Sequence, residues 1–348
     1  MYKLILRPIL FKIDPEKVHY LIVVCVKLLH KIPGVKFIFK SIFSIQHPKL
    51  ETQFLGITFK NPVGLAAGFD KNAKIFNEFA GFGFSYVEIG TVTPNFQPGN
   101  AKPRIFRVIK DKALINRMGI NNLGVDKAIE NLSHKNEDII IGGNIGKNTI
   151  TPTENAADDY ETCFNKLYEF VDYFTLNVSC PNVHNMADVQ DKESLNKIFQ
   201  KLAHARKAKS KYKPILVKLS PDWEIKQLND TIEVSIENNI DGFVISNTTI
   251  DRSNLCADNE LINKIGKGGL SGVPLHKKST EMIRYVANKT NGKLPIIGVG
   301  GIMSEQDAIE KLQAGATLLQ IYTGFIYEGP GFVKRLNKAI LMEKLKNK

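Results

Sequence analysis

The chain has 348 residues, of which 43% are hydrophobic, and its formal net charge is +12. This length and hydrophobic content indicate a globular protein with one large domain or two ordinary ones. The four cysteines are widely spaced with no CxxC pair, which excludes a disulfide framework and a cysteine zinc site and fits a reducing compartment.

The first fifty residues, which we call the leader, carry nine basic and two acidic side chains, a net charge of +7. A DPE start predicts a helix over 14–31, and a second apolar segment with lysines covers 35–45. The longest uncharged run, 18–26, is far shorter than the roughly 20 residues that cross a bilayer. No small-residue cleavage site follows, which disfavours a secretory signal.

Two interpretations of the leader remain open. The helices could simply cover one end of the fold, as ordinary helices do. A helix pair with apolar faces and a basic rim more naturally lies in the membrane interface. We therefore expect residues 1–50 to be a helical membrane-associating extension and residues 51–348 to form the main domain.

From residue 60 onward, short β-rich runs alternate with amphipathic helical stretches, the pattern of βα units on a parallel sheet. The predicted strands cover 62–67, 86–91, 139–144, 173–178, 215–219, 242–246, 295–299 and 318–322. The predicted helices cover 72–82, 123–134, 153–170, 192–210, 223–239, 276–290, 304–314 and 331–346. Eight such units favour a closed (β/α)8 TIM barrel, an α/β fold, over a doubly wound sheet, which uses the same alternation.

In such a barrel the site lies at the carboxyl ends of the strands. These ends are rich in glycine, amide, hydroxyl and lysine groups: AAGFDK, GTVTP, GGNIGKN, NVSCPN, VKLSPD, SNTT, GVGGI and YTGF. Glycine lets the backbone approach a ligand closely, and its N–H group can hold phosphate. Gly300, Gly301 and 322–324 follow the last two strands, the usual phosphate position, and so indicate a phosphate-bearing cofactor.

Lysine and asparagine side chains suggest what else binds there. Alternation turns Lys218 into the barrel mouth, where a cation is costly unless it meets negative charge, such as that of a reduced flavin. The alternative is a buried lysine paired with a strand carboxylate.

The amides suit a planar ligand edged with carbonyl and N–H groups, such as a pyrimidine: Asn116, Asn121, Asn144, Asn177, Asn182 and Asn247. Scarce carboxylates and scattered histidines disfavour a metal site.

The order and spacing of ten stretches resemble the dihydroorotate dehydrogenase family over nearly the whole chain: AAGFDKN, EIGTVTPNFQPGNAKPRIFR, INRMGINN, GGNIGKN, NVSCPN, VKLSPD, SNTT, GGLSG, IIGVGGI and LLQIYTGFIYEGP. The leader, with DPEKVH, resembles the membrane-associated, quinone-linked class 2 enzymes. The resemblance implies FMN-dependent oxidation of dihydroorotate to orotate in pyrimidine (UMP) synthesis, with a membrane quinone as acceptor. It further implies a monomeric peripheral protein on the cytoplasmic face of the cell membrane, with no nucleic-acid partner.

The resemblance also assigns roles to individual residues. FMN would be held by Ala67, Gly68, Phe69, Asp70, Lys71, Thr91, Asn144, Asn177, Lys218, Ser246, Gly272, Gly301, Tyr322 and Thr323. Dihydroorotate would contact Lys71, Asn116, Arg117, Met118, Gly119, Ile120, Asn177, Asn182, Asn247 and Thr248. The quinone tunnel would be lined by His19 and Arg107.

Cys180 stands at the position of the catalytic base, which removes the C5 proton while the C6 hydride passes to N5 of FMN. Class 2 enzymes typically carry serine there and soluble class 1 enzymes carry cysteine, so this chain combines a class 2 leader with a class 1 base. Ile120 is a second departure, because class 2 enzymes usually place an aromatic side chain in that substrate loop.

Three other functions are weighed against this one. A class 1-like soluble enzyme that uses fumarate or NAD is supported by Cys180 but leaves the leader without a purpose. An RNA-acting flavin barrel, such as a dihydrouridine synthase, fits the positive charge, yet the excess lies in the leader rather than around the barrel mouth. A membrane-surface binding protein without catalytic activity would lack flavin.

Overall fold

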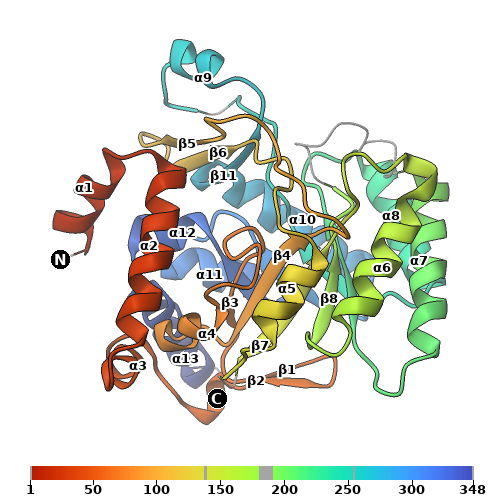
Figure 1. The fold of residues 1–348 in the computed structure, drawn as a ribbon, viewed down its shortest axis with the longest axis horizontal. Coiled ribbons are helices and arrows are strands. Elements are labelled where there is room, and N and C mark those ends of the chain that lie inside the picture. The colour runs from red at the N-terminus through yellow and green to blue at the C-terminus, as the bar shows by residue number, and fades with distance from the viewer. Residues whose placement is uncertain (1, 137–138, 180–190, 254, 347–348) are drawn as a thin grey trace.

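The computed structural model describes residues 2–136, 139–179, 191–253 and 255–346 (Figure 1). Within them, eight parallel strands close into a barrel in the order β10-β12-β13-β3-β4-β7-β8-β9. Their bounds are β3 (Val63–Leu65), β4 (Tyr86–Val92), β7 (Ile140–Ile145), β8 (Tyr173–Leu176), β9 (Ile215–Leu219), β10 (Gly242–Ile245), β12 (Ile296–Val299) and β13 (Ala316–Ile321). The predicted TIM barrel is confirmed.

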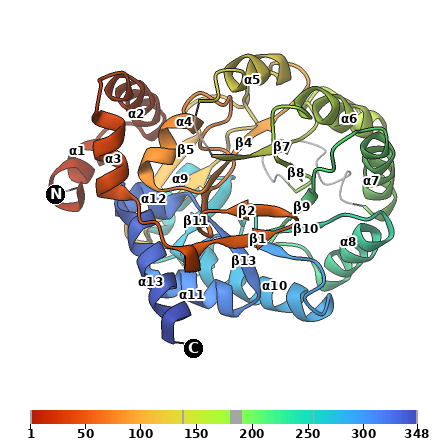
Figure 2. The same ribbon diagram turned by 90° about the horizontal axis from the view of Figure 1, so that it is seen from below.

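A helix follows each barrel strand and packs on the outside of the ring, as the view from below shows (Figure 2). These helices are α4 (Phe76–Phe79), α5 (Val125–Leu132), α6 (Ala156–Leu167), α7 (Lys192–Lys207), α8 (Ile225–Glu237), α10 (His276–Lys289), α11 (Glu305–Gln313) and α13 (Phe332–Lys346), with the short α12 (Thr323–Glu328) before α13. The predicted helix over 72–82 is wrong at its start. The Asp70 carboxylate accepts hydrogen bonds from the Lys74 and Ile75 N–H groups, which folds this stretch into a turn before α4.

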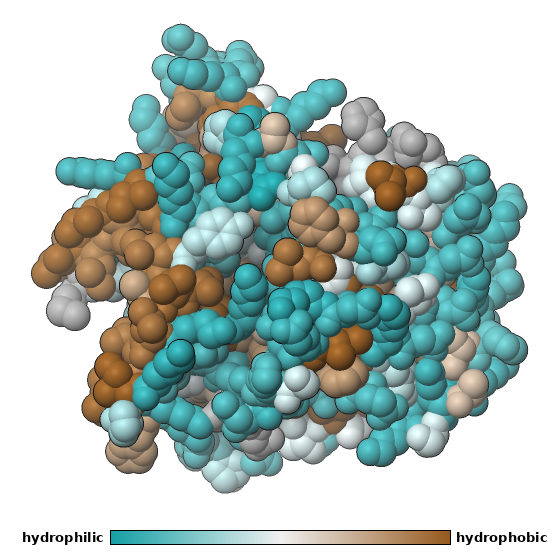
Figure 3. Space-filling view, viewed as in Figure 1, coloured by the Kyte–Doolittle hydropathy of each residue, from teal (hydrophilic) through white to brown (hydrophobic). Residues whose placement is uncertain are grey.

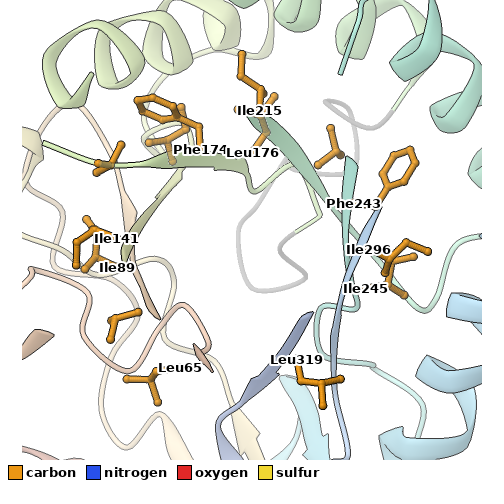
Figure 4. Close-up of a cluster of buried hydrophobic side chains, with 14 of the residues drawn as sticks. Leu65, Ile89, Ile141, Phe174, Leu176, Ile215, Phe243, Ile245, Ile296 and Leu319 are labelled. Atoms are coloured by element: carbon orange, nitrogen blue, oxygen red, sulfur yellow. The ribbon is translucent and has the colours of Figure 1, made fainter. Parts of the chain in front are cut away.

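Alternate side chains of the strands serve two cores. Those on the outer side of the ring pack beneath the helices (Figure 4), including Leu65, Ile89, Ile141, Phe174 and Leu319. Those on the inner side fill the barrel. At its amino-terminal end the barrel is closed by the hairpin of β1 (Thr52–Phe54) and β2 (Ile57–Phe59), whose Phe59 ring lies 5.1 Å from the Tyr86 ring.

A small antiparallel sheet that the sequence did not predict lies above the carboxyl-terminal end of the barrel (Figure 1). It consists of β5 (Ile105–Val108), β6 (Ala113–Asn116) and β11 (Gly269–Gly272), in the order β11-β6-β5, with α9 (Asn259–Ile265) beside it. These strands belong to the loops that follow β4 and β10. The sheet therefore adds a wall to the predicted site.

The leader folds as a short π-helix (Tyr2–Leu6), α1 (Arg7–Phe11), α2 (Pro15–His30) and α3 (Val35–Phe43), all on one side of the barrel (Figures 1 and 2). The side chain of Asp14 caps α2 by accepting from two N–H groups of its first turn, as the DPE motif predicts. Helix α2 contacts β5 and α4. In the described part of the chain, every helix is too short or too polar to cross a membrane.

Candidate active site

A pocket opens at the carboxyl-terminal end of the barrel, beneath the sheet of β5, β6 and β11. Its wall contains most of the predicted FMN and dihydroorotate residues, which come from loops far apart in the sequence. These are Ala67, Gly68, Lys71, Thr91, Asn116, Met118, Gly119, Ile120, Asn177, Lys218, Ser246, Asn247, Thr248, Gly272, Gly301, Tyr322 and Thr323. The structure thus brings together residues from separate strand ends and from the INRMGINN and GGLSG stretches.

Four predicted cofactor or substrate residues lie outside the pocket wall. Phe69 packs edge-to-face against Tyr322, and Asp70 is buried in its turn, where burial raises the pKa of its carboxyl to about 6. Asn144 is fully buried behind Thr91. Arg117 donates hydrogen bonds to the backbone carbonyls of Ile265 in α9 and of Pro103. Their direct ligand contacts remain predictions, as do those of Cys180 and Asn182, which lie outside the described residues.

The wall also contains residues that the sequence analysis missed. Ile105, Leu114 and Ser271 come from the unpredicted sheet, and Gln320 comes from inside β13. Ser271 and Gln320 stand in the quoted stretches GGLSG and LLQIYTGF, so their motifs offered a signal. The two apolar residues could not be identified without the sheet that positions them.

Glycines create a tight backbone cradle at one end of the pocket. Gly301 has a φ of +72°, and a Cβ atom there would come within 2.4 Å of His276 Cα. Gly272 has a φ of +99°, and its Cβ would lie 2.3 Å from the Lys112 carbonyl oxygen. Larger residues would be both strained and obstructed at these positions. Gly272, Gly301 and Thr323 all line the pocket, and glycine backbone with a nearby hydroxyl is suited to a phosphate group, which the sequence predicted here.

Hydrogen bonds join several amide and hydroxyl side chains of the pocket wall. Asn247 Nδ2 donates to Asn177 Oδ1 over 3.3 Å, and Asn177 Nδ2 donates to Thr91 Oγ1 over 2.8 Å. Lys218 is buried in the same wall, where its backbone carbonyl accepts a hydrogen bond from the Ser179 hydroxyl. The result is a fixed polar surface suited to a planar heterocycle.

Lys71 supplies a positive charge to the pocket. Its Nζ donates to the Gly68 carbonyl oxygen over 2.9 Å, and burial, followed by the charge of Arg104, lowers the lysine pKa to about 8. Lysine is cationic below its pKa, so the pocket holds this charge at neutral pH and loses it in mild alkali.

Binding of orotate, the carboxylate ligand that the family resemblance implies, should therefore weaken as the pH rises through about 8. We expect its dissociation constant to increase roughly tenfold between pH 7 and pH 9.5, because the cation that attracts the carboxylate is lost. Titration of flavin absorbance with orotate measures this constant. The Lys71→Met variant should bind more weakly at pH 7 and show a flat profile; a wild-type profile that is equally flat would exclude Lys71 as the cation.

The two predicted quinone residues, a histidine and an arginine, lie outside the pocket wall and join the leader to its neighbours. The His19 ring lies 5.1 Å from the Phe69 ring, and burial, followed by the charge of Lys71, lowers the histidine pKa to about 4, so the imidazole is neutral. Arg107 donates to the carbonyl oxygens of Phe11 and Ile13, and its guanidinium stacks over the Phe11 ring at 4.6 Å. Both predicted quinone residues thus lie where the leader meets the barrel.

A second arginine fixes the leader to the pocket loop. Arg104 and Glu16 of α2 are both buried and form a two-point ion pair, with Nη2 to Oε1 at 2.9 Å and Nε to Oε2 at 3.2 Å. Arg104 also donates to the carbonyl oxygens of Pro98 and Asn100. Asn100 in turn bonds the backbone of Met118 in the pocket wall. Helix α2 and the predicted substrate loop are therefore held by one arginine.

Comparison with known proteins identifies the family. The dihydroorotate dehydrogenase family model matches residues 49–344. A Christiangramia forsetii protein named dihydroorotate dehydrogenase (quinone) is 50% identical over 98% of this chain and 99% of its own length. A Haemophilus ducreyi protein of the same name is 42% identical over 98% and 100%. The crystal structure of ligand-free DHODH from Eimeria tenella superposes with a TM-score of 0.87 at 32% identity, covering 96% of each chain. The chain therefore belongs to the dihydroorotate dehydrogenase family.

Proposed function

We propose that this chain oxidises dihydroorotate to orotate in pyrimidine synthesis, with FMN as prosthetic group and a quinone as electron acceptor. The observation that carries the proposal is the pocket itself, in which a backbone cradle, a fixed amide and hydroxyl wall and a lysine meet beneath the sheet of β5, β6 and β11. The full-length relatives named for the quinone-linked reaction support the same activity.

The pocket fits FMN at both ends. The backbone at Gly272 and Gly301, with the Thr323 hydroxyl, would hold the phosphate, because all three residues line the pocket and glycine N–H groups can hold an anion. Thr91 and Lys218 would contact the ring system from the opposite part of the wall. FMN supplies a two-electron acceptor for the substrate, which the side chains of this chain do not contain.

The remaining wall would bind and orient dihydroorotate. Lys71 attracts the carboxylate, while the amides of Asn116, Asn177 and Asn247 present donors and acceptors to the ring edge. Holding the substrate in one orientation places its C5 proton toward the base and excludes other geometries. We assign the base to Cys180, on the resemblance of NVSCPN to the family motif.

The leader would bring the quinone to the pocket. Helix α2 packs on β5, and Ile105 of β5 lines the pocket, so the leader lies beside the cofactor position. The neutral imidazole of His19 can hydrogen-bond a quinone carbonyl without introducing charge. We propose residues 1–50 as the quinone-access segment and residues 51–348 as the barrel that binds FMN and dihydroorotate.

Steady-state assays with different acceptors test this function. Purified enzyme should oxidise dihydroorotate rapidly with a ubiquinone or menaquinone analogue and at least tenfold more slowly with fumarate or NAD. Faster turnover with fumarate or NAD than with either quinone would favour the class 1-like alternative that the cysteine base suggests.

The leader presents an apolar surface that fits a lipid bilayer. Figure 3 shows brown side chains gathered over α1, α2 and α3 on the left of the molecule. The exposed apolar side chains of α2 and α3 include Leu21, Leu28 and Phe37, which are 48%, 57% and 77% exposed. Lysines interrupt the same helices, which suits anionic headgroups. We propose that the protein is a monomer that lies on the cytoplasmic face of the cell membrane by this surface and has no nucleic-acid partner.

Vesicle binding should depend on these side chains. The triple variant Leu21→Glu, Leu28→Glu, Phe37→Glu should lose most of its binding to vesicles that contain anionic lipid, measured by co-sedimentation, because three charges replace apolar contact. The control Ile236→Glu changes an equally exposed isoleucine on α8, far along the chain from the leader, and should bind as the wild type does. Equal binding by the triple variant would remove the leader from membrane association.

A further inference from the structure

A carboxylate that the proposed mechanism does not use lies inside the barrel, below the pocket. Glu88 in the middle of β4 is fully buried, and its two oxygens accept four hydrogen bonds. Oε1 accepts from Asn144 Nδ2 over 2.8 Å. Oε2 accepts from Tyr173 OH at 3.2 Å, Thr175 Oγ1 at 3.1 Å and Gln320 Nε2 at 2.7 Å. Every partner of Glu88 is therefore a donor.

One set of hydrogen bonds runs from Glu88 to the pocket in a single direction. Asn144 turns its Nδ2 to Glu88, so its Oδ1 faces Thr91 and accepts from the Thr91 hydroxyl over 2.6 Å. The Thr91 oxygen, whose hydrogen is used, then accepts from Asn177 Nδ2. Asn177 Oδ1 accepts from Asn247 Nδ2 in turn. Each group donates toward the carboxylate, which fixes the donor and acceptor ends of the whole series.

A second route from Glu88 to the pocket passes through Gln320. Its Nε2 donates to Glu88, which leaves its carbonyl Oε1 as the end that faces away from the carboxylate. That oxygen is buried and has no hydrogen-bond partner among the described residues, although Gln320 belongs to the pocket wall. A buried acceptor without a partner costs free energy unless a ligand donor meets it.

We propose that Glu88 is a positioning residue that fixes the hydrogen-bond polarity of the pocket wall, through Asn144 and Thr91 on one side and through Gln320 on the other. Through these contacts Glu88 holds the Asn177 amide in one orientation toward the proposed flavin and substrate rings. It also leaves the Gln320 side-chain carbonyl free to accept a hydrogen bond from a ligand. This inference rests on the proposed function, because its readout is the bound flavin.

Burying the Glu88 carboxylate inside the barrel does not by itself stabilise the fold. Removing it from water is costly, and well-packed apolar side chains stabilise a barrel interior at least as well. Burial, followed by the charge of Glu88, raises the pKa of Tyr173 well above its ordinary value, so that phenol remains a donor. The arrangement is explained by what it imposes on its neighbours, since only an acceptor on both oxygens orients both amides.

Glutamine at position 88 cannot reproduce this arrangement. The introduced amide has one acceptor end and one donor end, while Asn144 and Gln320 each present a donor, one to each oxygen. Whichever way the new group turns, its NH2 faces one of the two amides, and that amide must reverse. The isosteric Glu88→Gln change therefore alters the pocket wall with little change in packing.

The test uses FMN-loaded protein and begins with the wild type. If the wild type holds no FMN, or dihydroorotate does not reduce it, the proposed function fails and Glu88 is not at issue. With that established, Glu88→Gln should shift the visible absorption maximum of the flavin and slow its anaerobic reduction by dihydroorotate about tenfold, the effect of one misplaced hydrogen bond. Stopped-flow spectroscopy measures both quantities.

Thr175→Val is the matched control, because it removes a donor from Glu88 without touching either route to the pocket. It should lower the melting temperature as much as Glu88→Gln does and leave the flavin spectrum and reduction rate unchanged. Asn144→Leu, which interrupts one route behind the pocket wall, provides a second variant if Glu88→Gln does not fold, and should also shift the spectrum. A wild-type spectrum and rate in the folded variant, or an equal change in Thr175→Val, would overturn the proposal.

Discussion

Replacing Cys180 by alanine should lower turnover by roughly 10²- to 10⁴-fold, the usual contribution of a general base, and leave FMN bound. Alanine cannot accept the C5 proton, whereas the residues that we propose to hold FMN are unchanged in this variant. Steady-state turnover and flavin absorbance of the same preparation check both parts. Cys256→Ala, which removes an exposed thiol, is the matched control and should retain full activity.

The serine variant separates a base from a merely necessary side chain. An ordinary thiol has a pKa of about 8.5 and ionises far more easily than a hydroxyl. Cys180→Ser should therefore keep measurable activity with a pH optimum shifted to the alkaline side. Full activity in Cys180→Ala would end the assignment of the base, which rests on the family motif because Cys180 lies outside the described residues.

Removing the buried charge of Glu16 should have the largest effect on stability. The Glu16→Ala change leaves the Arg104 guanidinium buried without its carboxylate, and breaking such a pair typically costs about 3 to 5 kcal/mol. Urea denaturation at pH 7 measures this loss in the free energy of unfolding. Because Arg104 also holds the loop that supports Met118, the dihydroorotate KM should rise with it.

Lys102→Ala is the matched control for that pair. Lys102 Nζ lies 3.5 Å from the same Glu16 oxygen, but its side chain is 64% exposed, so its loss should cost less than about 1 kcal/mol. Burial raises the Glu16 pKa, but the hydrogen bond and charge of Arg104 outweigh it, so the net shift is downward. The pair therefore stabilises the protein above the carboxyl's unfolded pKa and less as the pH falls through its folded pKa. Similar losses of unfolding free energy in Glu16→Ala and Lys102→Ala would contradict a buried ion pair.

The barrel could be predicted because each of its strands is a short apolar run that ends in turn residues. All eight strands of the barrel overlap their predicted ranges, and the predicted range 215–219 matches β9 at both ends. The sheet of β5, β6 and β11 could not be predicted in the same way. Its strands have four residues each, and Asn116 pairs with Gly269, 153 residues away, so no local pattern records the pairing.

The site was partly predictable for a related reason. Glycines, amides and lysines at strand ends converge in any closed barrel, so the backbone cradle at Gly301 and the amide wall follow from the motifs. The proposed role of Glu88 could not be predicted from a motif, because it depends on four hydrogen-bond donors from three other strands. For Asp70 the motif suggested a role that the structure does not show. Its place in AAGFDKN predicted cofactor contact, whereas its carboxylate accepts hydrogen bonds that close a local turn.

This pocket should hold a flavin that dihydroorotate reduces and a quinone reoxidises. The most direct measurement is an anaerobic titration of the purified protein, followed by its visible absorbance. We expect one equivalent of dihydroorotate to bleach the bound FMN and a ubiquinone analogue to restore the yellow colour within one turnover. Protein that binds no FMN, or flavin that stays oxidised when dihydroorotate is added, would exclude this reaction.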